Sequence, residues 1–191
     1  MYVLIPKSTA TDLKSCEMIP DIFGSEHCPI KFSFHTKLSY SERYVESPGK
    51  FEVVHQKGDV LGSPIDNVLA HAISEDLALS AGFARTIQKL FKVRDLIDAE
   101  SHHVGLAVCT KSKDRIIYNL VTKRKYNHLP DDLDVEDALV NLKIQMHKRG
   151  HWFLSIPEIC CGLDKMNLDD ILKLIETVFR KSGIRVTMYH L

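Results

Sequence analysis

Two hydrophobic patterns alternate along most of the chain. Short runs of apolar and β-branched residues are typical of strands buried in a sheet, and longer segments with apolar residues every three or four positions are typical of helices packed on one. The expected strands are 51–57, 67–73, 104–109, 115–121, 152–156 and 184–188, and the expected helices begin near 81, span 133–148 and begin at 167. This order predicts an α/β fold in which a mixed sheet is covered by helices on both faces.

The first 49 residues do not share these patterns. They are rich in serine and threonine and end in Glu46-Ser-Pro-Gly49, a composition typical of a linker or boundary. We therefore expect an N-terminal extension over residues 1–49 and one folded domain over residues 50–191. The composition is compatible with partial disorder in the extension, although residues 30–34 alternate like a strand.

Composition narrows the classes of function. The chain has 191 residues, with 25 Lys and Arg against 25 Asp and Glu, so no net basic field favours direct nucleic-acid binding. No run approaches the ~18 apolar residues of a membrane helix, and the apolar start is too short for a signal peptide. The five cysteines are an odd number without metal-ligand spacing. We expect a monomeric intracellular protein, cytoplasmic, nuclear or both, that needs no metal.

Charged side chains follow two of the expected strands. Lys123 ends the run that starts at Ile116, and Asp164 ends a glycine-bearing segment that follows the strand at 152–156. In α/β proteins ligands bind at the carboxyl ends of strands, so a lysine and a carboxylate could meet there and perform chemistry. The alternative is that Lys123 belongs to a solvated Lys123-Arg-Lys125 cluster and that Asp164 only begins a helix.

Three short segments could contact a ligand, and each has a simpler interpretation. Gly58-Asp59 follows a strand but is more often a plain turn. Ser80-Ala-Gly82 at a helix start offers backbone N–H groups to a phosphate, without the spacing of a Walker loop or a dinucleotide fingerprint. Cys160-Cys-Gly162 could face an anion or form a tight turn. His71, inside an apolar run, is interpreted as a buried, hydrogen-bonded core residue rather than a metal ligand.

Five motifs in order nevertheless resemble a macrodomain, of the group of terminal ADP-ribose protein glycohydrolases. They are Lys57-Gly-Asp59, Leu69-Ala-His-Ala-Ile-Ser-Glu-Asp76, Ser80-Ala-Gly-Phe-Ala84, Asn119-Leu-Val-Thr-Lys123 and Pro157-Glu-Ile-Cys-Cys-Gly-Leu-Asp164. The resemblance runs from about Phe51 to Leu191. It implies a three-layer α/β/α macrodomain with a mixed central sheet and a ligand cleft at the strand ends.

The resemblance also implies roles for individual residues. Lys123 would be the nucleophile that attacks C1″ of the distal ribose, and Asp164 the proton-transfer partner. Other positions of the group bind the adenine, the distal ribose, the diphosphate or the rest of the ligand. The implied substrate-binding residues are Asp59 and Val60 at the adenine, Ser74 at the distal ribose, Ala81, Gly82, Cys160, Cys161 and Gly162 at the diphosphate, and Phe83, Ile159, Leu163 and Leu191.

Two positions depart from the pattern of the group. Ser80 replaces the first glycine of a Gly-Ala-Gly loop, and Cys160 replaces a glycine in the second loop. Both changes remove the most permissive residue, so a positive φ at Cys160 or a crowded diphosphate would weaken binding. The pair Lys123 and Asp164 is unaffected.

Three functions follow from these observations. The first is an ADP-ribose glycohydrolase, without cofactor, that removes mono-ADP-ribose from glutamate and aspartate side chains of proteins and deacylates O-acyl-ADP-ribose. The second is a non-catalytic reader that binds ADP-ribose, which the loop departures favour. The third is an interaction protein with a degenerate cleft, because a fold alone does not determine function.

Overall fold

The computed structural model describes residues 13–18, 30–34 and 49–191. The chain divides into two compact units, Met1–Arg43 and Tyr44–Leu191. In the first unit, β1 (Leu13–Met18) pairs antiparallel with β2 (Ile30–Phe34), which confirms the strand expected at 30–34. The expectation of partial disorder falls on the remainder of residues 1–48, outside the described residues. The boundary at residue 49 stays a prediction.

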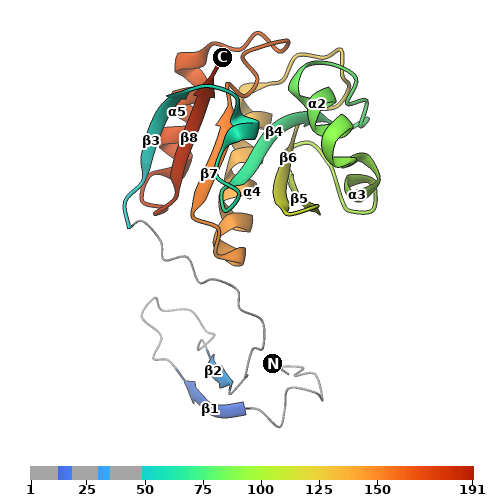
Figure 1. Ribbon diagram of the computed structural model, residues 1–191. Coiled ribbons are helices and arrows are strands. Elements are labelled where there is room, and N and C mark those ends of the chain that lie inside the picture. Colours follow the sequence, from blue (N-terminus) through green and yellow to red (C-terminus); the bar gives the residue numbers. More distant parts are fainter. Residues whose placement is uncertain (1–12, 19–29, 35–48) are drawn as a thin grey trace. The chain divides into compact units, whose positions relative to one another are not determined.

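The second unit is built on a six-stranded mixed sheet (Figure 1). Its strands lie in the order β3-β8-β7-β4-β6-β5, with all neighbours parallel except β5 and β6. This last pair is the predicted hairpin. The strands are β3 (Glu52–Lys57), β4 (Val68–Ser74), β5 (Ala107–Ser112), β6 (Arg115–Lys123), β7 (Phe153–Pro157) and β8 (Arg185–His190). Because β3, β4, β6, β7 and β8 are parallel, their carboxyl ends share one edge of the sheet.

Helices cover both faces of this sheet. α4 (Asp132–Arg149) and α5 (Leu168–Phe179) lie behind the sheet in Figure 1, and α2 (Gly82–Phe91) and α3 (Arg94–Asp98) belong to the other face. The expected α2, α4 and α5 are confirmed, whereas α3 and the 3-10 turn η1 (Val60–Gly62) were not predicted. The arrangement is the three-layer α/β/α sandwich that the resemblance implies.

The period-2 pattern of the strands separates two apolar cores. In β4, Val68 and Ala70 pack with α4 and α5, whereas Leu69 and Ile73 pack with α2 and α3. Successive side chains of a strand point to opposite faces, so β4, β5, β6 and β8 contribute to both cores. This double burial explains why β4 is a continuous apolar run.

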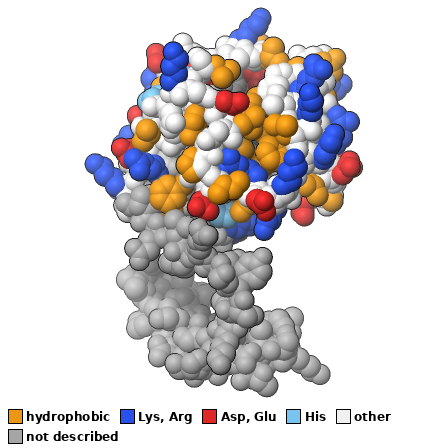
Figure 2. Space-filling view, in the orientation of Figure 1, with side chains coloured by type: hydrophobic (Ala, Val, Ile, Leu, Met, Phe, Trp, Pro, Cys, Tyr) orange, Lys and Arg blue, Asp and Glu red, His pale blue; other side chains and the backbone are white. Residues whose placement is uncertain are grey.

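The surface carries both signs of charge, in agreement with the equal numbers of basic and acidic residues in the sequence. Figure 2 shows acidic, basic and apolar side chains interspersed on one face of the described part. None of the described helices combines the length and the apolarity that a membrane-spanning helix requires.

Candidate active site

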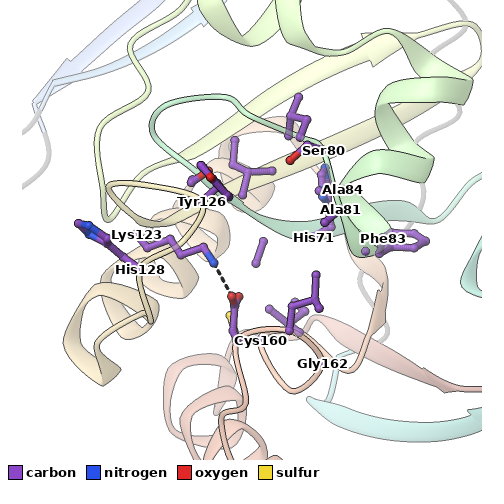
Figure 3. Close-up of a pocket in the computed structure, with 18 of the residues that line it drawn as sticks. His71, Ser80, Ala81, Phe83, Ala84, Lys123, Tyr126, His128, Cys160 and Gly162 are labelled. Atoms are coloured by element: carbon purple, nitrogen blue, oxygen red, sulfur yellow. Dashed lines mark hydrogen bonds and ion pairs between the residues drawn. The ribbon is translucent and has the colours of Figure 1, made fainter.

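Lys123 and Asp164 meet at the carboxyl edge of the sheet. Lys123 is the last residue of β6, and Asp164 lies in the connection from β7 to α5. Lys123 Nζ donates a hydrogen bond to Asp164 Oδ1, and the two form an ion pair (Figure 3). Their side chains are only 12% and 13% exposed. The solvated alternative for Lys123 is therefore wrong, because its ammonium group faces a carboxylate in a largely enclosed place.

The pair lies in a cavity of about 520 Å³ at the ends of β4, β6 and β7. Parallel strands bring these ends together, as expected for a ligand site in an α/β protein. The cavity walls come from the ends of these strands, from the start of α2, and from the segments that follow β6 and β7. The lining residues are His71, Ala72, Ile73, Ser74, Leu79, Ser80, Ala81, Gly82, Phe83, Ala84, Lys123, Tyr126, Asn127, His128, Leu129, Pro157, Glu158, Ile159, Cys160, Gly162, Leu163 and Asp164.

Most of the residues predicted from the sequence are brought together here. Besides Lys123 and Asp164, the predicted residues that line the cavity are Ser74, Ala81, Gly82, Phe83, Ile159, Cys160, Gly162 and Leu163. A further lining residue is Ser80, which the sequence singled out as a departure. The contacts of each with a ligand stay predictions.

Four predicted residues do not line the cavity. Asp59 caps η1, where its side chain accepts a hydrogen bond of 2.9 Å from the Leu61 N–H, and Val60 is buried in the core beside α2. Cys161 Sγ donates a hydrogen bond to the carbonyl of Ile159, two residues earlier in the chain. Leu191 is fully exposed after β8. A role for these residues would lie beyond the cavity around Lys123.

The segment 126–129 and His71 were not predicted to belong to the site. Tyr126, Asn127, His128 and Leu129 follow β6 in a connection without periodicity or a motif, and only the fold shows that it borders the cavity. His71 is 1% exposed and contacts Asn119 and the ring of Phe83, which confirms the expected buried, hydrogen-bonded residue. It also forms part of the cavity wall.

A hydrogen-bond network connects the loop that follows β4 with the segment that follows Lys123 at the end of β6. The Ser74 hydroxyl donates to Asp76 Oδ1 at 2.6 Å, and the Tyr126 N–H donates to Asp76 Oδ2 at 3.1 Å. Burial opposes ionisation of Asp76, but these bonds and the one from the Ala78 N–H hold its pKa below the usual value. The Glu75 N–H also donates to the carbonyl of Lys123 at 2.9 Å. Asp76 thus fixes the segment that follows β6 to the loop that precedes α2.

The two expected phosphate loops both contain left-handed backbone. Cys160 has φ 60°, a conformation that glycine adopts with less strain, and Gly82 has φ 55°. A Cβ placed on Gly82 would lie 3.2 Å from Leu163 Cδ1, so the two loops approach closely across the cavity. The positive φ considered at Cys160 from sequence is present.

The ionisable side chains of the cavity differ in their chemistry. Burial lowers the pKa of His71 to about 4, against the opposing influence of Asn119 and the Ala72 backbone, so the ring is neutral at neutral pH. Burial raises the pKa of the Cys160 thiol to about 12, which removes it as a nucleophile. Among the described residues no group of three His, Cys, Asp or Glu side chains is arranged to hold a metal ion. The ion pair of Lys123 and Asp164 is the combination suited to covalent and proton-transfer chemistry.

Known proteins of similar sequence share most of this unit. The human ADP-ribose glycohydrolase OARD1 is 35% identical over 147 residues, which are 76% of this chain and 96% of the human protein. The bovine ADP-ribose glycohydrolase OARD1 is 35% identical over 140 residues, covering 73% of this chain and 91% of that protein. No protein-family model matches the sequence.

Solved structures share the fold at lower identity. The macrodomain of Thermus aquaticus DarG superposes with a TM-score of 0.63 at 16% identity, covering 74% of this chain and 99% of that one. Thermosipho africanus DarTG, solved in complex with ADP-ribose, has a TM-score of 0.62 at 18% identity, covering 71% of this chain and 41% of that one. Fold and sequence together show that this chain belongs to the macrodomain family, in its group of OARD1-type ADP-ribose glycohydrolases.

Proposed function

We propose that this protein hydrolyses the ester bond between ADP-ribose and a carboxylate, with Lys123 as nucleophile and Asp164 as proton-transfer partner. The substrates would be proteins mono-ADP-ribosylated on glutamate or aspartate, and O-acyl-ADP-ribose. The observation that carries the proposal is the hydrogen-bonded pair of Lys123 and Asp164, enclosed in the cavity at the strand ends.

The first step requires a neutral amine. An ammonium group has no lone pair, so Lys123 must lose a proton before it attacks, and Asp164 is already hydrogen-bonded to Nζ and can accept it. Nζ then forms a bond to C1″ of the distal ribose as the bond from C1″ to the ester oxygen breaks. The carboxylate leaves with the electron pair, and Lys123 carries the ADP-ribosyl group.

The second step releases the sugar. A water molecule attacks C1″ as the bond to Nζ breaks, and Asp164 transfers the proton that the departing amine needs. Lys123 and Asp164 return to their starting states, so the cycle consumes one water and one ester. The neutral His71 and the protonated Cys160 are poor candidates for either role at neutral pH.

Substrate binding would use the two loops that meet at Gly82 and Leu163. The N–H groups at the start of α2 are unpaired within the helix and favour an anion such as a diphosphate. The loop at 160–162 faces the same cavity from β7. This arrangement supports a binding mode in which the diphosphate lies between the two loops and the distal ribose lies beside Lys123.

The reader hypothesis is a second candidate, favoured by the strained backbone of Cys160. Two measurements distinguish the candidates: calorimetry with ADP-ribose, and release of ADP-ribose from a peptide modified on glutamate. We expect both binding and release, with release lost in Lys123→Ala. Binding without release would select the reader, and equal release by wild type and Lys123→Ala would exclude this mechanism.

A further inference from the structure

One wall of the cavity takes no part in the proposed contacts with ADP-ribose. In Figure 3, Tyr126 and His128 lie on one side of the ion pair, whereas Ala81, Phe83 and Gly162 lie on the other side. The diphosphate loops occupy the second side. The first side, formed by residues 126–129, lines the same cavity as the proposed nucleophile Lys123.

Large apolar side chains protrude around the mouth of the cavity, two from the segment 126–129 and one from the loop after β7. Tyr126 is 61% exposed, Leu129 69% and Leu163 67%, and all three line the cavity. They do not pack together into a core, so each leaves apolar area in water. Clustered exposed aromatic and aliphatic side chains of this kind mark contact with another molecule, and side chains that protrude suit a protein surface better than a single acyl chain.

Cations flank both reactive residues along the chain. Arg124 and Lys125 directly follow Lys123, and Lys165 directly follows Asp164. All three are exposed, and within the described part of the chain none has an ion-pair partner. Uncompensated cations beside a binding site favour a partner with negative charge.

We infer that these six residues form a docking surface for the protein part of the substrate, and that the preferred partner is an acidic polypeptide segment around the modified carboxylate. We call this the rim surface: Arg124, Lys125, Tyr126, Leu129, Leu163 and Lys165. The inference rests on the proposed hydrolase function and adds the class of polypeptide that the enzyme selects. Side chains of the partner cover the apolar residues, and its carboxylates approach the cations.

The test compares two substrates that share the reacting ester. One is a synthetic peptide with ADP-ribose attached through C1″ to a glutamate between flanking aspartates, and the other is 1″-O-acetyl-ADP-ribose, which has its ester at the same carbon and no polypeptide. The measured quantity is the ratio of kcat/KM for the peptide to kcat/KM for the small ester. Any change in the chemistry at Lys123 affects both substrates and cancels in this ratio.

Charge reversal at the rim should change the ratio. The double variant Arg124→Glu with Lys125→Glu should lower it about tenfold, the size of an electrostatic effect on association, mainly through KM for the peptide. Tyr126→Ala with Leu129→Ala should lower it as well. Replacing the aspartates of the peptide by serine should remove most of the difference between wild type and the charge-reversed variant.

The matched control makes the same change of charge elsewhere. Lys148 at the end of α4 and Lys181 before β8 are exposed and lie outside the cavity lining, so Lys148→Glu with Lys181→Glu should leave the ratio as in wild type. A ratio unchanged by rim reversal, or lowered equally by the control, would overturn the docking surface while leaving the hydrolase intact. Failure of the wild type to hydrolyse either substrate would overturn the proposed function, and the docking surface with it.

Discussion

Lys123 Nζ donates a hydrogen bond to Asp164 Oδ1, although 41 positions separate the two residues in the sequence. The fold creates this contact because β6 and β7 flank β4 and run parallel to it, so that their ends open at one edge. The pair therefore depends on both the sheet and the loop after β7. Its replacement is the first test of function.

Removal of either partner should abolish turnover without unfolding the protein. Lys123→Ala deletes the proposed nucleophile, and Asp164→Asn keeps the shape but cannot accept a proton, so kcat for an ADP-ribosyl ester should fall at least ~10²-fold in each. Melting temperatures measured in parallel are the control for folding. Near-normal kcat in Asp164→Asn would contradict the proton-transfer role.

Cys160→Gly should tighten ADP-ribose binding. At φ 60° a residue with a Cβ is strained by roughly 1–2 kcal/mol, and glycine removes both this strain and the thiol from the loop. Calorimetry with ADP-ribose measures the effect. Cys160→Ala is the matched variant, since it removes the sulfur but retains the Cβ. Equal tightening by both variants would assign the effect to crowding rather than to the backbone.

Gly82→Ala should weaken ADP-ribose binding. The new Cβ would lie 3.2 Å from Leu163 Cδ1, and the residue would be held at φ 55°, so the two loops would separate. The double variant with Leu163→Ala relieves the contact but not the backbone strain, and it should recover part of the affinity. Unchanged affinity in Gly82→Ala would show that the loops do not need this close approach.

His71 should make stability depend on pH. Its pKa in the folded protein is lowered to about 4 by burial, whereas the unfolded chain takes up the proton near the ordinary value of 6.5. The stabilisation is complete above that value and is lost as the pH falls toward 4, by on the order of 3 kcal/mol. Urea unfolding at pH 7 and pH 4.5 measures this change.

The variant His71→Gln is the control for this dependence of stability on pH. It removes the titrating ring, so the loss of stability between these two pH values should be smaller than in wild type, whatever its absolute stability. An identical loss in both proteins would mean that other groups cause the acid sensitivity.

Much of the fold could be predicted from the sequence because most elements bury long apolar patterns. The buried strand at β4 and the helical spacing in α5 are examples in which the pattern extends through the element. The five-residue α3 and the three-residue η1 are too short to show a period, and both were missed. Their positions depend on tertiary packing, as for Ile97 of α3 and Val60 of η1 in the core.

The parts of the candidate site that lie in recognisable sequence motifs could be predicted, and the other parts could not. Lys123, Asp164 and most of the two loops were predicted through the family resemblance. The segment 126–129 has no pattern of its own, and it reaches the cavity because β6 ends there and Asp76 holds the backbone of Tyr126. The monomeric state and the intracellular location stay predictions.

Lys123 should become covalently attached to ADP-ribose during turnover. The most direct measurement is mass spectrometry of the protein quenched during reaction with an ADP-ribosylated glutamate peptide, in wild type, Asp164→Ala and Lys123→Ala. We predict an adduct of one ADP-ribosyl group that maps to Lys123 and is most abundant in Asp164→Ala, because water can replace Asp164 as the proton acceptor in the first step, whereas the step that releases the sugar loses its proton donor. Undiminished hydrolysis by Lys123→Ala, or an adduct on another residue, would contradict the account.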